Sequence, residues 1–164
     1  MCACTLAAMA GRLKRELKQK RPFSSLQEEV VLSLLRTADH VIVPLNALLR
    51  TADLSQSQYN VLRILRGAGD DGLACGEISE RMVRRDPDLT RLLDRLDGRG
   101  LVTRTRDARD RRIVRATITA DGLELLASLD APVVDAVKGA LSHIPSERLR
   151  TLLELLEDVR SVDD

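Results

Sequence analysis

The apolar residues of this chain change their spacing at Gly100, and this change restricts the folds that the sequence can adopt. Before that glycine, four leucines follow the three-and-four spacing of a helix with one buried face. They are Leu89, Leu92, Leu93 and Leu96. After it, the side chains of residues 101–106 and 113–118 repeat with a period of two, as those of half-buried strands do. The stretch between these segments, residues 107–112, is almost wholly charged, so the sequence predicts a helix followed by a β-hairpin with a charged tip.

Helices are also predicted before this region. Two capping boxes, in which a serine precedes a glutamate or glutamine by three residues, begin at Ser25 and Ser55. Each is followed by apolar residues at helical spacing. Pro44 lies inside the first of these patterns and removes one backbone N–H, so we expect a kink near residues 40–43.

Shorter and later helices complete the expected order of elements. A brief helical pattern covers residues 75–82, and Asp86 is expected to cap the leucine-rich helix that follows. Thr119 and Ser146 are expected to cap the last two helices, the first of them bent or broken at Pro132. Aromatic residues make up only 1% of the 164 residues, so the core must be mainly aliphatic. We therefore predict a mainly helical fold with a small β-hairpin wing.

The net charge of +1 hides two strongly basic blocks. Residues 81–115 hold twelve Arg and six Asp, a net charge of +6. Residues 12–21 hold six basic side chains and Glu16, a net charge of +5. A basic surface on an otherwise acidic body indicates a polyanionic partner, and a merely solvated face is the alternative. For residues 12–21, an arm that contacts phosphate and a mobile tail are both open interpretations.

Other classes of protein are not favoured. The sequence lacks the nucleophile-elbow, P-loop and zinc-protease motifs, so neither an enzyme nor a cofactor is expected. Its longest apolar runs are four or five residues, against about 18 for a membrane span. A cytoplasmic location without membrane contact is therefore expected. No metal site is expected, since His40 and His143 lie far along the chain from Cys2 and Cys4.

Two short helices joined by a turn and followed by a hairpin have the order of a winged helix-turn-helix. In that motif the second helix enters the major groove, and its outward side meets the bases. Arginine pairs with guanine, threonine contacts base edges or methyl groups, and aspartate accepts from cytosine. We expect DNA contacts from Asp88, Thr90, Arg91 and Arg95. Asp94 and Asp97 are expected to orient neighbouring arginines.

The chain resembles the multiple-antibiotic-resistance-regulator (MarR) family of bacterial transcription factors in the segments LSQSQYNVLRIL, EISERM, LTRLLDRLDGRGLVTR, DARDRR and ITADGLELL. The resemblance covers about residues 54–127, and the D-x-R-D-R-R hairpin with Thr119 and Gly122 is its most specific part. It implies a homodimer with a winged helix in each subunit and a pocket for a small effector. It also implies wing contacts to DNA from Arg109, Arg111 and Arg112. Pro87 and Asp88 depart from the small hydroxyl residues that many members carry there.

We therefore predict a dimeric regulator that binds double-stranded DNA at a pseudo-palindromic operator. We expect it to act as a repressor that a small-molecule effector releases. Arg36, His40 and Tyr59 are the candidate lining of the effector pocket. One alternative is a regulator that senses oxidation through Cys2, Cys4 or Cys75, and another is a winged helix that docks an acidic protein.

The expected division of the chain follows from this prediction. It consists of a mobile basic extension over 1–24, a dimerisation helix over 25–52 kinked near Pro44, a winged-helix DNA-binding domain over 53–120, and C-terminal dimerisation helices over 121–164.

Overall fold

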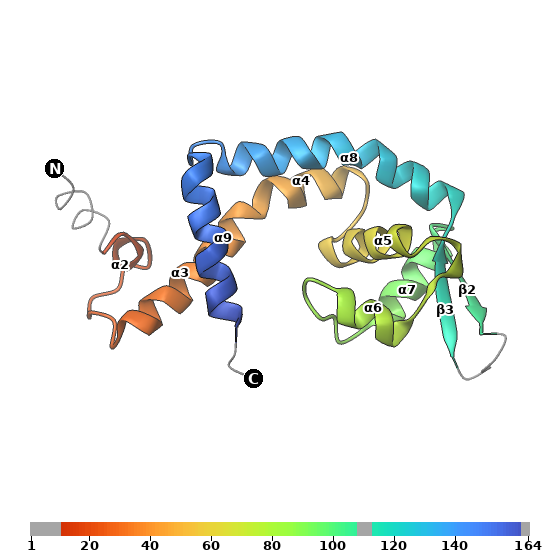
Figure 1. The fold of residues 1–164 in the computed structure, drawn as a ribbon, viewed down its shortest axis with the longest axis horizontal. Helices are drawn as coiled ribbons and strands as arrows, with labels where there is room; N and C mark the ends of the chain where they lie inside the picture. The colour runs from red at the N-terminus through yellow and green to blue at the C-terminus, as the bar shows by residue number, and fades with distance from the viewer. Residues whose placement is uncertain (1–10, 108–112, 162–164) are drawn as a thin grey trace. The chain divides into compact units, whose positions relative to one another are not determined.

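The structure is a computed structural model that describes residues 11–107 and 113–161. The chain divides into two units, Met1–Val43 and Pro44–Asp164, and helices predominate in both (Figure 1). The first unit contains α2 (Arg12–Glu16) and α3 (Leu26–Val41). From the junction onward the chain forms α4 (Val43–Thr51), α5 (Gln56–Ala68), the 3-10 turn η1 (Gly69–Asp71), β1 (Leu73–Ala74), α6 (Cys75–Arg81), α7 (Leu89–Gly98), β2 (Val102–Arg106), β3 (Val114–Ile118), α8 (Ala120–Leu141) and α9 (Ser146–Arg160).

The strands form one antiparallel sheet in the order β1-β3-β2. Strands β2 and β3 are the predicted hairpin, with Val102 paired to Ile118 and Arg106 paired to Val114. Strand β1 was not predicted, because two residues are too few to show an alternating pattern. Its Leu73 pairs with Ala116, so the chain that enters α6 is hydrogen-bonded to the wing. The predicted mainly helical fold with a small wing is confirmed.

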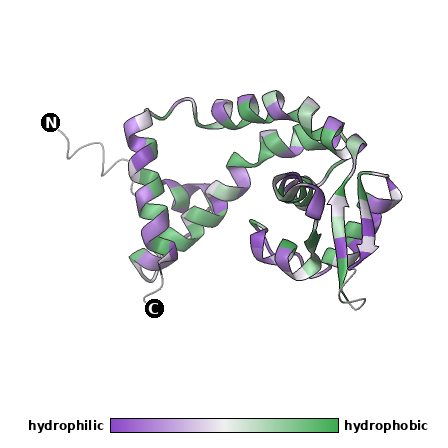
Figure 2. Ribbon diagram, turned by 45° about the vertical axis from the view of Figure 1, so that its right-hand side comes forward, coloured by the Kyte–Doolittle hydropathy of each residue, from purple (hydrophilic) through white to green (hydrophobic). Residues whose placement is uncertain are grey.

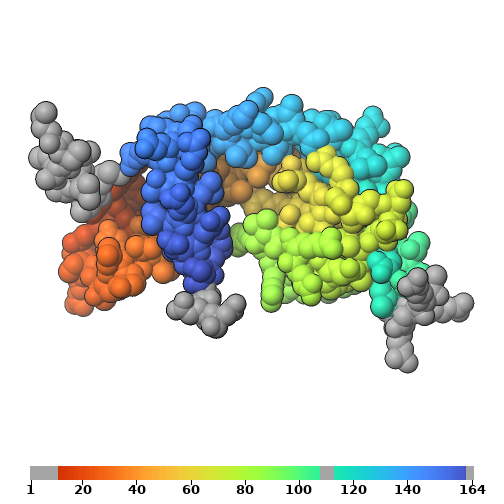
Figure 3. All heavy atoms as spheres, in the orientation of Figure 1, coloured from red at the N-terminus to blue at the C-terminus, as the bar shows by residue number. Residues whose placement is uncertain are grey.

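The core of the second unit is mainly aliphatic and lies against the inward side of α7. The four leucines that face inward from α7 are buried, as their spacing predicts. They pack in one cluster with side chains from α5, α6, β2 and α8. In Figure 3 the yellow atoms of α5 border directly on the green atoms of the helices that follow it. The core therefore fixes which side of α7 faces outward.

The predicted helix starts are confirmed where a side chain caps the helix. Ser55 Oγ accepts a hydrogen bond from Gln58 N–H, and Gln58 Oε1 accepts one from Ser55 N–H, so this capping box is complete. Ser25 Oγ accepts from Glu28 N–H, whereas the Glu28 carboxylate accepts from Ser24 N–H, one residue earlier than predicted. The helix breaks at Ile42 between α3 and α4, inside the range 40–43 of the predicted kink.

Three boundaries differ from the prediction. Helix α7 begins at Leu89, since the Asp86 carboxylate accepts from Asp88 N–H and forms a local turn in place of a helix cap. Ser146 is the first residue of α9, and Pro145 occupies the capping position. At Pro132, where a bend or a break is predicted, helix α8 does not break, and packing of the helix against the core compensates for one lost backbone hydrogen bond.

Two helices carry apolar side chains that a single chain leaves exposed. On α3 these are Leu26, Val30, Val31 and Leu35, and on α9 they are Leu152, Leu153, Leu155 and Val159. Figure 2 shows hydrophobic and hydrophilic residues interleaved along these helices. In the described residues, the helical stretch Leu26–Thr51 alone meets the length and composition of a membrane span, with a mean hydropathy of 1.2 in its most apolar window. Arg36 and Asp39 interrupt it, and an interrupted apolar stripe also suits packing against another helix.

Candidate nucleic-acid interface

The outward side of α7 carries the side chains that the sequence singles out. Asp88, Thr90, Arg91 and Arg95 are all exposed there. The Arg91 side chain is 76% exposed, and its Nη1 lies 3.3 Å from Asp88 Oδ2. Asp88, at the start of the helix, therefore balances one of the cations of this face. The charge of Arg95 is available to a ligand, because Arg95 forms no ion pair within the described residues.

An ion pair joins the wing to this helix. Arg104 on β2 donates a hydrogen bond from Nη1 to the carboxylate of Asp94 on α7. The Arg104 side chain is only 21% exposed, and its Nε is buried without a partner among the described residues. Asp94 was expected to orient a nearby arginine, and it does so across two elements. Arg104 itself was missed, because its spacing does not distinguish it from the other arginines of the hairpin.

On the other strand of the wing, Arg115 of β3 forms contacts that hold the base of the hairpin. Its Nε donates to Asp107 Oδ2 at 2.6 Å, and its Nη1 donates to the Gly72 carbonyl at 3.3 Å. Nη1 also lies 3.7 Å from Glu77 Oε2 on α6. The hydrogen bond to Asp107 is the main reason that the pKa of Arg115 is raised. The wing tip, with the predicted contacts Arg109, Arg111 and Arg112, lies outside the described residues.

Thr119 and Gly122 join the start of α8 to the turn between α7 and β2. Thr119 Oγ1 donates to the Gly100 carbonyl at 2.7 Å and accepts from Gly122 N–H at 3.1 Å. A Cβ on Gly122 would lie 2.3 Å from the Leu101 carbonyl oxygen. Only glycine therefore fits where α8 approaches the backbone of this turn.

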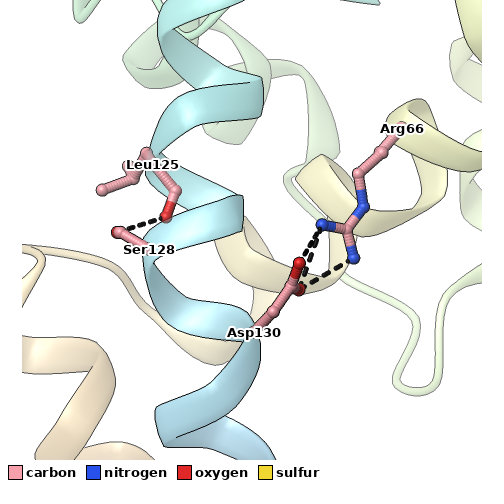
Figure 4. Close-up of polar contacts among 4 residues, drawn as sticks. All are labelled: Arg66, Leu125, Ser128 and Asp130. Carbon is pink, nitrogen blue, oxygen red and sulfur yellow. Dashed lines mark hydrogen bonds and ion pairs between the residues drawn. The ribbon is translucent and has the colours of Figure 1, made fainter.

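Two further arginines join the helix-turn-helix to α8 and to the turn after α4. Arg66 on α5 forms a bidentate pair with Asp130 on α8, with N–O distances of 2.9–3.0 Å (Figure 4). This hydrogen bonding lowers the pKa of Asp130 and raises that of Arg66. At the end of α7, Arg99 donates to the carbonyls of Asp53 and Ala52 at 2.5 and 3.2 Å. Arg66 thus ties α5 to α8, and Arg99 ties the end of α7 to the turn between α4 and α5.

The candidate pocket residues lie in different settings. Tyr59 is 7% exposed and belongs to the core of the second unit, with the Arg63 guanidinium carbon 5.8 Å from its ring centre. Arg36 and His40 are exposed on α3, in the first unit. The described residues contain no cluster of His, Cys, Asp and Glu that could hold a metal ion.

The candidate redox residues are only partly described. Cys75 is a free, partly buried thiol at the first position of α6. Cys2 and Cys4 lie outside the described residues. Oxidation sensing therefore stays a prediction.

Comparison with known proteins gives consistent matches. The model of the MarR family matches residues 54–114. The chain is 31% identical over 105 residues to the transcriptional regulator HosA of Escherichia coli O157:H7, a match that covers 63% of this chain and 76% of HosA. It is 22% identical over 133 residues to the homoprotocatechuate degradative operon repressor of Escherichia coli, covering 81% of this chain and 88% of the repressor.

Solved structures show the same relationship. A MarR transcription factor from Planctomyces limnophilus is 40% identical, with a TM-score of 0.65 over 83% of this chain and 98% of that one. A mutant MarR from Escherichia coli in complex with operator DNA is 25% identical, with a TM-score of 0.73 over 84% and 100% of the two chains. CouR from Rhodococcus jostii RHA1, bound to p-coumaroyl-CoA, shares the fold at 24% identity and a TM-score of 0.68, over 87% and 100%.

Proposed function

Because the chain belongs to the MarR family of DNA-binding transcriptional regulators, we propose that it is a homodimeric repressor of a pseudo-palindromic operator. The observation that carries the proposal is the outward face of α7. Its leucines are buried while Thr90, Arg91 and Arg95 are exposed, and a wing is fixed beside it through Arg104. This arrangement suits a helix that enters the major groove.

Within this proposal, Arg91 and Arg95 read guanine and Thr90 reads a base edge or a thymine methyl group. Asp88 has two roles available, since it can accept from cytosine N4 or hold Arg91 in place. The wing arginines Arg109, Arg111 and Arg112 supply phosphate or minor-groove contacts.

The proposed dimer covers the apolar side chains that α3 and α9 leave exposed. Residues 25–52 and 121–164 are the proposed dimerisation segments, flanking a DNA-binding domain over 53–120. Exposed leucines and valines on two amphipathic helices are what helix packing between two copies would bury. A two-fold dimer places two α7 helices about one duplex turn apart, roughly 34 Å.

The repressor role and release by a small molecule are proposed from relatives. One relative is named as an operon repressor, and a structural neighbour holds p-coumaroyl-CoA. The place where such an effector binds stays a prediction from the sequence. A cytoplasmic location is proposed with the role, since the DNA partner is there.

Selection of bound oligonucleotides from a random duplex pool tests the proposal. We expect an inverted repeat whose half-sites are centred about 10 base pairs apart. Enrichment of a single half-site would refute the dimeric arrangement. No enrichment, together with no retardation of random duplex DNA, would refute DNA binding and favour the module that docks an acidic protein.

A further inference from the structure

The loop between α6 and α7 is held rigidly at both ends and in its middle. Met82 and Leu89, which flank it, are both buried in the core. Asn60 on α5 accepts a hydrogen bond from Val83 N–H through Oδ1 at 2.9 Å. The Asp86 carboxylate accepts from the Asp88 N–H at 3.0 Å. The backbone of the loop over 82–88 is therefore held in place from both ends and from α5 before any ligand binds.

The side chains that this loop presents are of two kinds. Val83 is 87% exposed, more than any other large hydrophobic residue in the described chain. Arg84 and Arg85 follow it and are exposed, and within the described residues neither forms an ion pair or side-chain hydrogen bond. An apolar group beside two unpaired cations lies immediately before the helix whose outward side carries Arg91.

Core packing does not account for Val83, because its side chain lies outside the core cluster that contains its neighbour Met82. The α3 and α9 faces proposed for dimerisation do not include it either. Single exposed apolar residues are common on protein surfaces and need no role. In this loop, however, a hydrogen bond from α5 holds the backbone of the valine, and beside it are two guanidinium groups without a partner in the part of the chain that the structure describes. Duplex DNA offers partners for both kinds of group, namely the thymine methyl in the major groove and the phosphates along its edge.

We propose that residues 82–88 form a third DNA-contacting element, in addition to α7 and the wing. Val83 packs against the methyl group of a thymine next to the bases read by α7, and Arg84 and Arg85 bind the flanking phosphates. The inference rests on the proposed operator binding and adds a specificity-determining residue to it. It predicts a preference for thymine at one position of each half-site.

Replacement of thymine by deoxyuridine tests the Val83 contact, because it removes the methyl group and leaves base pairing intact. Each thymine of the selected operator is replaced in turn, symmetrically in both half-sites, and affinity is measured for the wild type and Val83→Ala. Replacement at the position that Val83 contacts should weaken wild-type binding about fourfold per half-site, or about 15-fold for the whole operator, as expected for a lost methyl contact. Val83→Ala should bind the unmodified operator with the same loss and should be insensitive to deoxyuridine there. Thymines at other positions serve as internal controls, because replacement there, including at any methyl group that Thr90 contacts, should affect the wild type and Val83→Ala equally. An unchanged melting temperature shows that the variant is folded.

The dependence of affinity on salt tests the two arginines. Arg84→Ala and Arg85→Ala should each reduce the slope of log affinity against log salt by about 0.9 per phosphate contact, or about 1.8 per dimer. Arg63→Ala is the matched control, because this exposed arginine on α5 lies outside the proposed dimerisation segments, α7, the wing and this loop; it should leave the slope unchanged. If Arg84→Ala and Arg85→Ala keep the same slope as the control and the wild type, the proposed phosphate contacts are wrong.

Failure of the proposed operator binding and failure of the Val83 contact give different results. If the wild type binds no duplex, the proposed function is wrong and the loop has no role in it. If the wild type binds its operator but Val83→Ala responds to deoxyuridine as the wild type does, operator binding stands and the Val83 contact is overturned.

Discussion

Arg104 on β2 and Asp94 on α7 form an ion pair that joins the wing to the outward side of the proposed recognition helix. The arginine is the less exposed partner, at 21%, so Asp94 stabilises its charge more than water does. Because the pair bridges two elements, the positions of the helix and the wing on DNA are set together.

Asp94→Ala should therefore weaken both folding and DNA binding. It leaves the Arg104 guanidinium half-buried without its acceptor, and we expect a loss of about 1 kcal/mol in unfolding free energy. Denaturant unfolding and operator affinity measure the two effects. Asp97→Ala, a change at an exposed aspartate of the same helix, should alter stability by less than about 0.5 kcal/mol. Equal effects of the two substitutions would show that the pair has no structural role.

Gly122→Ala should destabilise the domain strongly. Its Cβ would lie 2.3 Å from the Leu101 carbonyl oxygen and 2.8 Å from Ile118 Cγ1, so the helix start or the turn must move. We expect a loss of about 1–3 kcal/mol, as for overpacking in a core. Gly139→Ala is the control on the same helix, where no atom lies within 4 Å of the added Cβ. It should stabilise the protein by up to about 1 kcal/mol, so a thermal shift of the same sign for both variants would contradict this account.

The order of elements and the buried side of each helix were predictable from local signals. Leucine spacing gave the inward side of α7, and Ser55 and Thr119 gave helix starts, because these features depend on a few neighbouring residues. The start of α7 was misplaced by two residues, since the Asp86 side chain forms a turn and does not cap the helix.

The contacts that position the candidate site were harder to predict. Arg66 and Asp130 are 64 residues apart, and Arg99 meets backbone carbonyls 46 and 47 residues earlier. Such partners share no period or motif, so only the tertiary structure brings them together. The exposure of Val83 depends likewise on a tertiary contact, the hydrogen bond from its backbone N–H to Asn60 on α5.

The Arg66–Asp130 pair should make stability depend on pH at the acidic end. The pKa of Asp130 is lowered in the folded state, chiefly by hydrogen bonds from Arg66. Its contribution is therefore fully present above the ordinary carboxyl pKa of 3.8 and is lost as the pH falls through the lower folded value. Asp130→Asn should melt below the wild type near neutral pH, and the difference should shrink below about pH 4. Thermal melts across that range measure it, and a gap that widens in acid would contradict the assignment.

Leu153→Lys on α9 should weaken self-association if this face lies in the proposed dimer interface. Leu153 is exposed in one chain, so a charge there leaves the fold intact but cannot be buried against a second copy without a large penalty. Sedimentation equilibrium should show a dimeric wild type and a monomeric or weakly dimeric variant. Leu155 lies two residues further along the same helix, and Leu155→Lys maps how far the interface extends. A wild type that is monomeric at micromolar concentration would contradict the dimer.

The central claim is that the outward side of α7 reads operator DNA. Its most direct test is an equilibrium titration of the selected operator and of a guanine-substituted competitor with the wild type, Arg91→Ala and Arg95→Ala, at several salt concentrations. We predict that wild-type affinity falls by about 10³–10⁵ between 50 and 200 mM salt, and that each variant loses about 1–3 kcal/mol of discrimination at the guanine it reads. Salt-independent binding, or full discrimination retained by both variants, would contradict the claim.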